Sequence, residues 1–207
     1  MLETLILVLS VSIDSFLASI SYGTSKIKIP LRSVLILDII SSTMLGISLL
    51  VGGLLQNYIP LNIAKSISFI ILFCLGVYRL FEGVLKSYIN NNYKSLSPLT
   101  FKLFDFQFVL QVYADEIKAD FDNSKILTSK EAMYLAFALS LDSLAVGFGS
   151  SLISINYIEV FTLSIFIGFI LILLGFYIGK KFVENLNLNL SWLSGLMLII
   201  LAFLRVF

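Results

Sequence analysis

The chain has 207 residues, of which 58% are hydrophobic and only 13% charged, and its mean hydropathy is +1.00. Soluble domains carry about 25% charged residues, so this composition excludes an ordinary soluble protein and predicts one that is solvated largely by lipid. The net charge of +1 gives no basic field, so no nucleic-acid partner is expected, and the absence of histidine restricts any metal site to oxygen ligands.

Six runs of apolar residues follow one another, and each is long enough to cross the roughly 30 Å hydrocarbon core of a bilayer. Backbone N–H and C=O groups find no water in lipid, so these runs are expected to be helices and not strands. The sequence therefore predicts an all-α polytopic membrane protein with six transmembrane helices. The predicted spans cover residues 3–23, 32–55, 63–85, 131–153, 157–179 and 190–207.

The first two spans each carry an aspartate. Asp14 lies near the centre of the first span, where a carboxylate costs about 2.5–3.5 kcal/mol on insertion scales and therefore usually faces the bundle interior. Ser10 lies one helical turn before Asp14 on the same face and is an accessory metal-ligand candidate. Asp38 lies about two turns into the second span. It is either a further accessory ligand or an interfacial charge that pairs with Arg32.

Two arginines lie toward the ends of predicted spans, Arg79 in the third and Arg205 in the sixth. Long basic side chains near helix ends usually extend toward the membrane surface, so we expect both arginines to snorkel. Glu82 follows Arg79 by three residues and is well placed to pair with it.

One long polar connection, residues 86–130, separates the third span from the fourth. Its last part has the spacing of an EF-hand calcium loop, although Lys125 occupies the sixth position, where the sharp turn favours glycine. The competing interpretation is that Thr128 or Ser129 caps the next helix, with an acidic residue in its first turn. Both interpretations stay open. The candidate ligands of Ca²⁺ or another divalent cation are Asp120, Asp122, Ser124 and Glu131.

The second half of the chain repeats motifs of the first half in the same order. The S-x-D-S element at residues 12–15 recurs at 140–143, so Asp142 in the fourth span corresponds to Asp14 in the first. Each repeat has three spans, and the second copy must therefore cross the membrane with the opposite orientation. We expect two inverted three-helix repeats, residues 1–85 and 131–207. The other matches pair Gly46 with Gly168, Gly53 with Gly175 and Arg79 with Arg205.

The distribution of lysine and arginine among the connections predicts the orientation, because cytoplasmic loops are enriched in these residues. The bias puts both termini outside the cytosol and the long connection inside it. The opposite set of loops holds only Lys65. The basic residues expected on the cytoplasmic side are Lys26, Lys28, Arg32, Lys86, Lys94, Lys102, Lys180 and Lys181.

Asp14 and Asp142 are the candidates for the functional centre. Two carboxylates at equivalent midplane positions indicate an ion path, although hydrogen bonding with neighbouring serines for helix association is an alternative. Carboxylate, hydroxyl and water oxygens suit a hard cation such as Mg²⁺, Mn²⁺ or Ca²⁺. Proton carriage by one aspartate is equally compatible with the residues.

The paired S-x-D-S elements, above all the stretch from Ser140 to Gly149, resemble those of the manganese efflux pump family (MntP). The acidic connection that ends in Ser129-Lys130-Glu131-Ala132 resembles the sporulation membrane protein branch called YtaF. The resemblance implies a six-helix exporter in which Asp14 and Asp142 are Mn²⁺ ligands. Pumps of the family carry a further acidic residue in the second span. Here residues 39–46 are uncharged, and Asp38 is the nearest carboxylate.

Two functions follow from these patterns. The first is a divalent-cation exporter, a carrier and not an enzyme, that works by alternating access in the cell membrane. The second is a non-transporting, sporulation-associated membrane protein whose cytoplasmic loop responds to a cation, with the aspartates holding helices together. The composition is compatible with a homo-oligomer in either case.

Overall fold

The computed structural model describes residues 2–56, 58–92, 112, 116–153, 155–181 and 191–206, and the side chains of these residues except at 82–92, 191–194 and 205–206. Most of these residues are helical, and the described parts of the chain contain no β-strand, as expected for apolar segments in lipid. The helices are α1 (Leu2–Thr24), α2 (Leu31–Gln56), α3 (Leu61–Asn92), the 3₁₀ helix η1 (Glu116–Ala119), α5 (Ser129–Ser151), α6 (Tyr157–Lys181) and α7 (Ser191–Val206).

Every predicted span coincides with an α-helix, and five of these helices are long and apolar enough to cross a membrane. The sixth helix, α7, has 16 described residues, with its apolar part at Gly195–Leu204. Helix α3 differs most from expectation, because it continues to Asn92 and not only to residue 85. The last turns of α3 are polar. Because hydropathy detects the end of an apolar segment and not the end of a helix, the predicted span ended too early.

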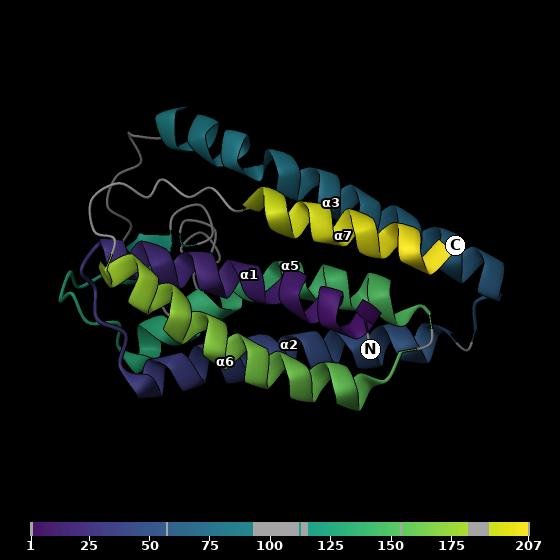
Figure 1. Ribbon diagram of the computed structural model, residues 1–207, viewed down its shortest axis with the longest axis horizontal. Helices are drawn as coiled ribbons and strands as arrows, with labels where there is room; N and C mark the ends of the chain where they lie inside the picture. Colours follow the sequence, from purple (N-terminus) through teal and green to yellow (C-terminus); the bar gives the residue numbers. More distant parts are fainter. Residues whose placement is uncertain are drawn as a thin grey trace.

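The helices form two groups (Figure 1). Helices α3 and α7 lie side by side along one side of α1, α2, α5 and α6. The most extensive contacts join α1 to α6, α2 to α5, and α3 to α7. The connection between α1 and α2 lies at one end of the bundle, and the start of α1 lies toward the other end together with the end of α7.

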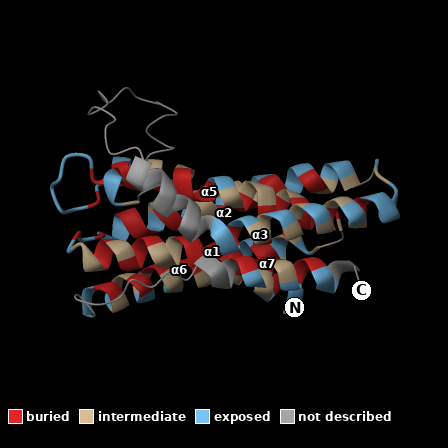
Figure 2. Cartoon of the chain, turned by 90° about the horizontal axis from the view of Figure 1, so that it is seen from above, coloured by how far each residue is buried: buried red, intermediate tan, exposed pale blue. Residues whose placement is uncertain are grey.

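Buried and exposed residues alternate along each helix (Figure 2). Large apolar side chains such as Leu54, Ile158 and Phe166 are exposed, which suits helices whose outer faces contact lipid. The buried apolar residues form two separate clusters. One cluster includes Ala18 of α1 and Leu139 of α5. The other includes Val11, Leu45, Leu72, Val146 and Leu198.

Glycines allow the paired helices to approach closely. A Cβ atom at Gly175 of α6 would lie 2.5 Å from the carbonyl oxygen of Phe16 in α1. At the α3–α7 crossing, a Cβ at Gly76 would lie 2.8 Å from the Gly195 carbonyl oxygen, and one at Gly195 would lie 2.6 Å from that of Gly76. These distances are too short for a methyl group, so close helix packing explains the glycines at these crossings.

Candidate functional site

Asp14 of α1 and Asp142 of α5 meet at one guanidinium group, that of Arg79 in α3. Both terminal nitrogens of Arg79 donate to the two carboxylate oxygens of Asp14. The Nη2 atom also donates to Asp142 Oδ2 at 2.7 Å. A planar guanidinium matches carboxylate oxygens in this forked geometry, which favours arginine over lysine at such a position. The two aspartates are therefore close enough to share one cation.

The Arg79 and Asp14 side chains are buried, and that of Asp142 is only slightly exposed. The exposed fractions are 4% for the Arg79 side chain, 9% for Asp14 and 16% for Asp142. Along both α1 and α5, residues of one apolar cluster come before the aspartate and residues of the other cluster come after it. A polar centre thus separates two apolar layers, and the Arg79 guanidinium compensates part of its negative charge within the protein.

The prediction that Arg79 snorkels at a helix end is wrong. Helix α3 begins at Leu61 and continues to Asn92, so Arg79 lies well inside the helix and its side chain turns inward. The signal that could have identified its role was the pair of midplane carboxylates, because two buried charges of one sign require a compensating cation. The side chains of Glu82 and Arg205 lie outside the described residues, so the predictions made for them stay predictions.

Ser10 lies on the Asp14 face of α1, as predicted, and is 1% exposed. Its hydroxyl donates to the Leu7 carbonyl oxygen at 2.8 Å within the same helix. The Ser10 hydroxyl uses its hydrogen in this bond. It would therefore assist a cation only through the lone pairs of its oxygen atom.

Asp38 is buried, and the expected pairing with Arg32 at the membrane surface is wrong. Asp38 is 3% exposed, whereas Arg32 is exposed, and no ion pair joins them in the described part of the chain. The Asp38 carboxylate lies where a Cβ atom of Gly168 in α6 would be. The same Cβ position on Gly168 is 4.0 Å from the hydroxyl oxygen of Ser12, which lies two residues before Asp14. The missing methyl group of Gly168 therefore lets Asp38 face α1 and α6.

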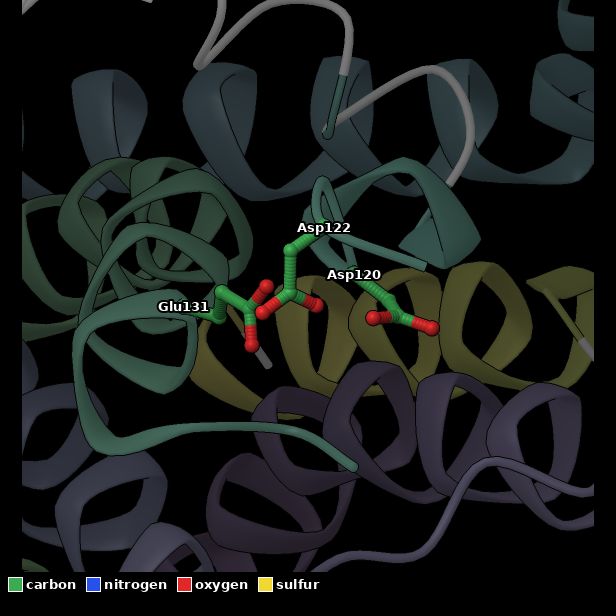
Figure 3. Close-up of side chains that lie close together, drawn as sticks. All are labelled: Asp120, Asp122 and Glu131. Carbon is green, nitrogen blue, oxygen red and sulfur yellow. The ribbon is translucent and has the colours of Figure 1, made fainter. Parts of the chain in front are cut away.

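Three carboxylates also come together where the connection meets the first turn of α5 (Figure 3). Asp120, Asp122 and Glu131 each offer an oxygen atom within 4.8 Å of the others. Asp120 and Glu131 are buried, and Asp122 is exposed. The backbone N–H of Ser124 donates to Asp120 Oδ1 at 3.1 Å and to Asp122 Oδ1 at 2.9 Å. Hydrogen bonding by Ser124, through its side chain and then its backbone, holds the pKa of Asp122 below its usual range.

The loop turns sharply at Lys125, which replaces the glycine typical of an EF-hand. Lys125 has a φ of 61°, the left-handed conformation that glycine adopts most readily. Its N–H donates to Asp120 Oδ2 at 3.3 Å, and its carbonyl accepts the N–H of Lys28 at 2.8 Å. The segment before the loop is only the four-residue helix η1, so a complete helix–loop–helix pair is absent from the described residues.

The helix-cap interpretation of the same segment is confirmed. Thr128 is the N-cap of α5, and it forms a reciprocal capping box with Glu131. Glu131 Oε2 accepts from the Thr128 N–H and hydroxyl, both at 2.7 Å, while Glu131 Oε1 accepts from Phe121 N–H at 3.2 Å. Capping and carboxylate clustering therefore occur together, and Glu131 takes part in both.

Comparison with known proteins identifies the family. The chain is 29% identical to "Probable sporulation protein YtaF" of Bacillus subtilis (strain 168) over 160 residues, 75% of each chain. It is 26% identical to "Putative manganese efflux pump MntP" of Methanosphaera stadtmanae over 207 residues, 98% of this chain and 97% of the relative. The protein of the same name from Aliarcobacter butzleri is 27% identical over 207 residues, with the same coverage.

No solved structure matches the chain. Residues 49–204 match the family described as "Putative manganese efflux pump" (Mntp). This match covers more than half of the sequence and includes α3, α5, α6 and most of α7. The multi-pass helical architecture and this match agree, and the chain belongs to the Mntp family of membrane proteins.

Proposed function

We propose that this protein exports a divalent metal cation, Mn²⁺ first among them, from the cell, and that Asp14 and Asp142 bind the ion. The observation that carries the proposal is the convergence of both carboxylates on the single guanidinium of Arg79. Side chains that share one cationic group lie close enough to share a metal ion. Their oxygen atoms suit hard divalent cations, and the family name of the relatives points to manganese.

Alternating access between two inverted three-helix repeats is the proposed mechanism. In the proposed repeats, α1 corresponds to α5, α2 to α6 and α3 to α7. This correspondence converts the contact between α1 and α6 into the contact between α5 and α2, and it leaves the contact between α3 and α7 unchanged. The helix contacts therefore support a pseudo-twofold relation that passes between Asp14 and Asp142. Rocking of one repeat against the other about a fixed midplane site then exposes the ion to each side in turn.

The end of the bundle that contains the α1–α2 connection is proposed to face the cytosol. Exposed lysines lie at this end of the bundle. Lys180 is one of them, since the last turn of α6 packs against Gly23 at the end of α1. Export then works against an inside-negative potential, which costs about 4.6 kcal/mol for a dication per 100 mV, from about 2.3 kcal/mol per charge. Coupling to a second ion, such as an inward-moving proton, supplies this free energy.

Asp38 is proposed as an accessory ligand beside the aspartate pair. It lies closer than Asp14 to the α1–α2 connection along the chain, yet its carboxylate reaches the level of Ser12. A buried carboxylate at that level offers the cation an additional oxygen ligand close to Asp14.

Efflux from manganese-loaded cells tests the proposal. Asp14→Asn and Asp142→Asn keep the side-chain shape but remove one charge each, so both variants should lose at least tenfold of the export rate. Asp122→Asn, the same change at an exposed loop position, is the matched control and should export like the parent. Unchanged export by both midplane variants contradicts the proposal.

The carboxylate cluster before α5 favours a second candidate function, a cation-responsive loop in a sporulation-associated membrane protein. Two of its three carboxylates are buried, and the loop is tied to the α1–α2 connection at Lys28. A bound Ca²⁺ or Mn²⁺ would stabilise the folded state in proportion to its affinity. Thermal-shift series on Asp120→Asn/Asp122→Asn and on Asp14→Asn/Asp142→Asn distinguish the sites, because only the site that binds the ion loses the shift.

A further inference from the structure

We propose that Arg79 is a tethered substitute for the transported ion, which neutralises the aspartate pair in part in the metal-free carrier and is displaced when a divalent cation binds. The inference rests on the proposed function and extends it to the step in which the carrier returns without cargo. It assigns Arg79 the role of a specificity-determining and positioning residue. The bonds from its guanidinium to both Asp14 and Asp142 motivate the assignment.

The charges at the site require displacement. Two ionised carboxylates and one guanidinium have a net charge of −1, whereas the carboxylates with a dication are neutral. If Arg79 stayed in place, the site would hold an excess positive charge in a buried position, which is unfavourable. A monovalent cation that replaced Arg79 would restore only the −1 state, so the exchange favours a divalent ion.

The geometry also requires displacement. Arg79 occupies both oxygens of Asp14 and one oxygen of Asp142, which are the atoms that a metal would need. The guanidinium belongs to α3, while its partners belong to α1 and α5, so it is able to leave without moving either aspartate. It also lies next to the closest α3–α7 crossing, where a Cβ at Gly195 would be 3.1 Å from the Arg79 Cβ.

This position links binding of the ion to helix movement. Gly76 and Gly195 let α3 and α7 pack closely at the level of Arg79, so we expect a movement of α3 to carry α7 with it. Release of the guanidinium removes the ionic link between α3 and the helices α1 and α5. The empty carrier, in contrast, keeps that link and reorients with its carboxylates neutralised in part by Arg79.

A net exporter must return without metal, whereas an exchanger never does. Arg79 and one inward-moving proton together neutralise both carboxylates on that return. A carrier without Arg79 would have to reorient with an uncompensated carboxylate in the membrane interior, which is strongly unfavourable. It would still be able to reorient with a metal bound. Loss of Arg79 should therefore abolish net transport and preserve exchange of one metal ion for another.

Purified protein in liposomes separates the two activities. Radioactive Mn²⁺ uptake into vesicles that contain unlabelled Mn²⁺ measures exchange, and uptake into metal-free vesicles at clamped potential measures net transport. For Arg79→Gln we expect exchange within twofold of the parent and net transport at least tenfold lower. Arg79→Lys retains the charge without the forked geometry and should recover part of the net transport. Arg32→Gln, at an exposed position, is the control and should match the parent.

Binding of Mn²⁺ to the same purified proteins completes the test. Removal of the competing guanidinium should tighten binding by Arg79→Gln at least threefold relative to the parent. Net transport by Arg79→Gln at the parent rate overturns the inference, and so does loss of both activities without tighter binding. A parent that neither binds nor moves Mn²⁺ overturns the proposed function itself, which distinguishes the two failures.

Discussion

A methyl group added at Gly175 of α6 should destabilise the protein, because it meets backbone and not a movable side chain. The new Cβ would lie 2.5 Å from the Phe16 carbonyl oxygen and 3.1 Å from both Phe16 Cδ2 and Ser19 Cβ. A carbon normally approaches a carbonyl oxygen to about 3.3 Å or more, so α1 and α6 would have to separate by roughly 0.8 Å. Gly175→Ala is therefore an overpacking substitution at the interface that positions Asp14.

Overpacking of this kind costs about 1–3 kcal/mol, and a gap of 0.5–1 Å elsewhere along the interface forfeits about a quarter to a half of each contact's attraction. We expect Gly175→Ala to lower the free energy of unfolding by about 1 kcal/mol, from about 2 kcal/mol for overpacking less about 1 kcal/mol gained in helix propensity. Reversible unfolding in mixed detergent micelles, followed by circular dichroism, measures this difference.

Gly46→Ala is the control, the same change at a helix glycine of the first repeat that faces only a side chain. Its Cβ would contact only the Phe161 ring, at 3.2 and 3.5 Å, and that side chain is partly exposed and able to move. The helix-propensity gain should offset the contact, leaving stability within about 0.5 kcal/mol of the parent. Equal stability of Gly175→Ala and the parent, or an equal loss in both variants, would refute the packing argument.

Substitutions test three other contacts. Thr128→Ala removes the α5 cap and should cost about 1 kcal/mol of unfolding free energy, which Thr128→Ser should restore. Tyr22→Phe removes the 2.6 Å hydrogen bond from the Tyr22 hydroxyl to the Glu116 carbonyl oxygen, so it should cost about 1 kcal/mol and speed proteolysis near residue 116. Asp38→Asn should raise the KM for Mn²⁺ several-fold with little change in maximal export, and Gly168→Ala, whose methyl group displaces the Asp38 carboxylate, should have the same effect. An unchanged KM in both variants would exclude Asp38 from the ion path.

The apolar spans and the aspartate pair could be predicted from sequence because each depends on a strong local rule. Lipid forces apolar runs to be helical, and a carboxylate in the middle of such a run must face protein. The Thr128 cap could be predicted for a similar reason, since capping residues act on the backbone three positions away.

Features that depend on packing between distant helices could not be predicted. Nothing local distinguishes Arg79 from a snorkelling arginine, because its inward direction follows from the length of α3 and from partners on α1 and α5. The burial of Asp38 depends on the rotation of α2 against Gly168, which hydropathy does not report. The turn at Lys125 violates the local preference for glycine and is held by bonds to Asp120 and Lys28.

A crystal structure with Mn²⁺, with anomalous diffraction recorded at the manganese absorption edge, tests the central claim most directly. We expect one anomalous peak between the carboxylates of Asp14 and Asp142, with the Arg79 guanidinium moved away from both. A peak only at Asp120, Asp122 and Glu131, with Arg79 still bridging the midplane aspartates, would contradict the claim and would favour the cation-responsive loop.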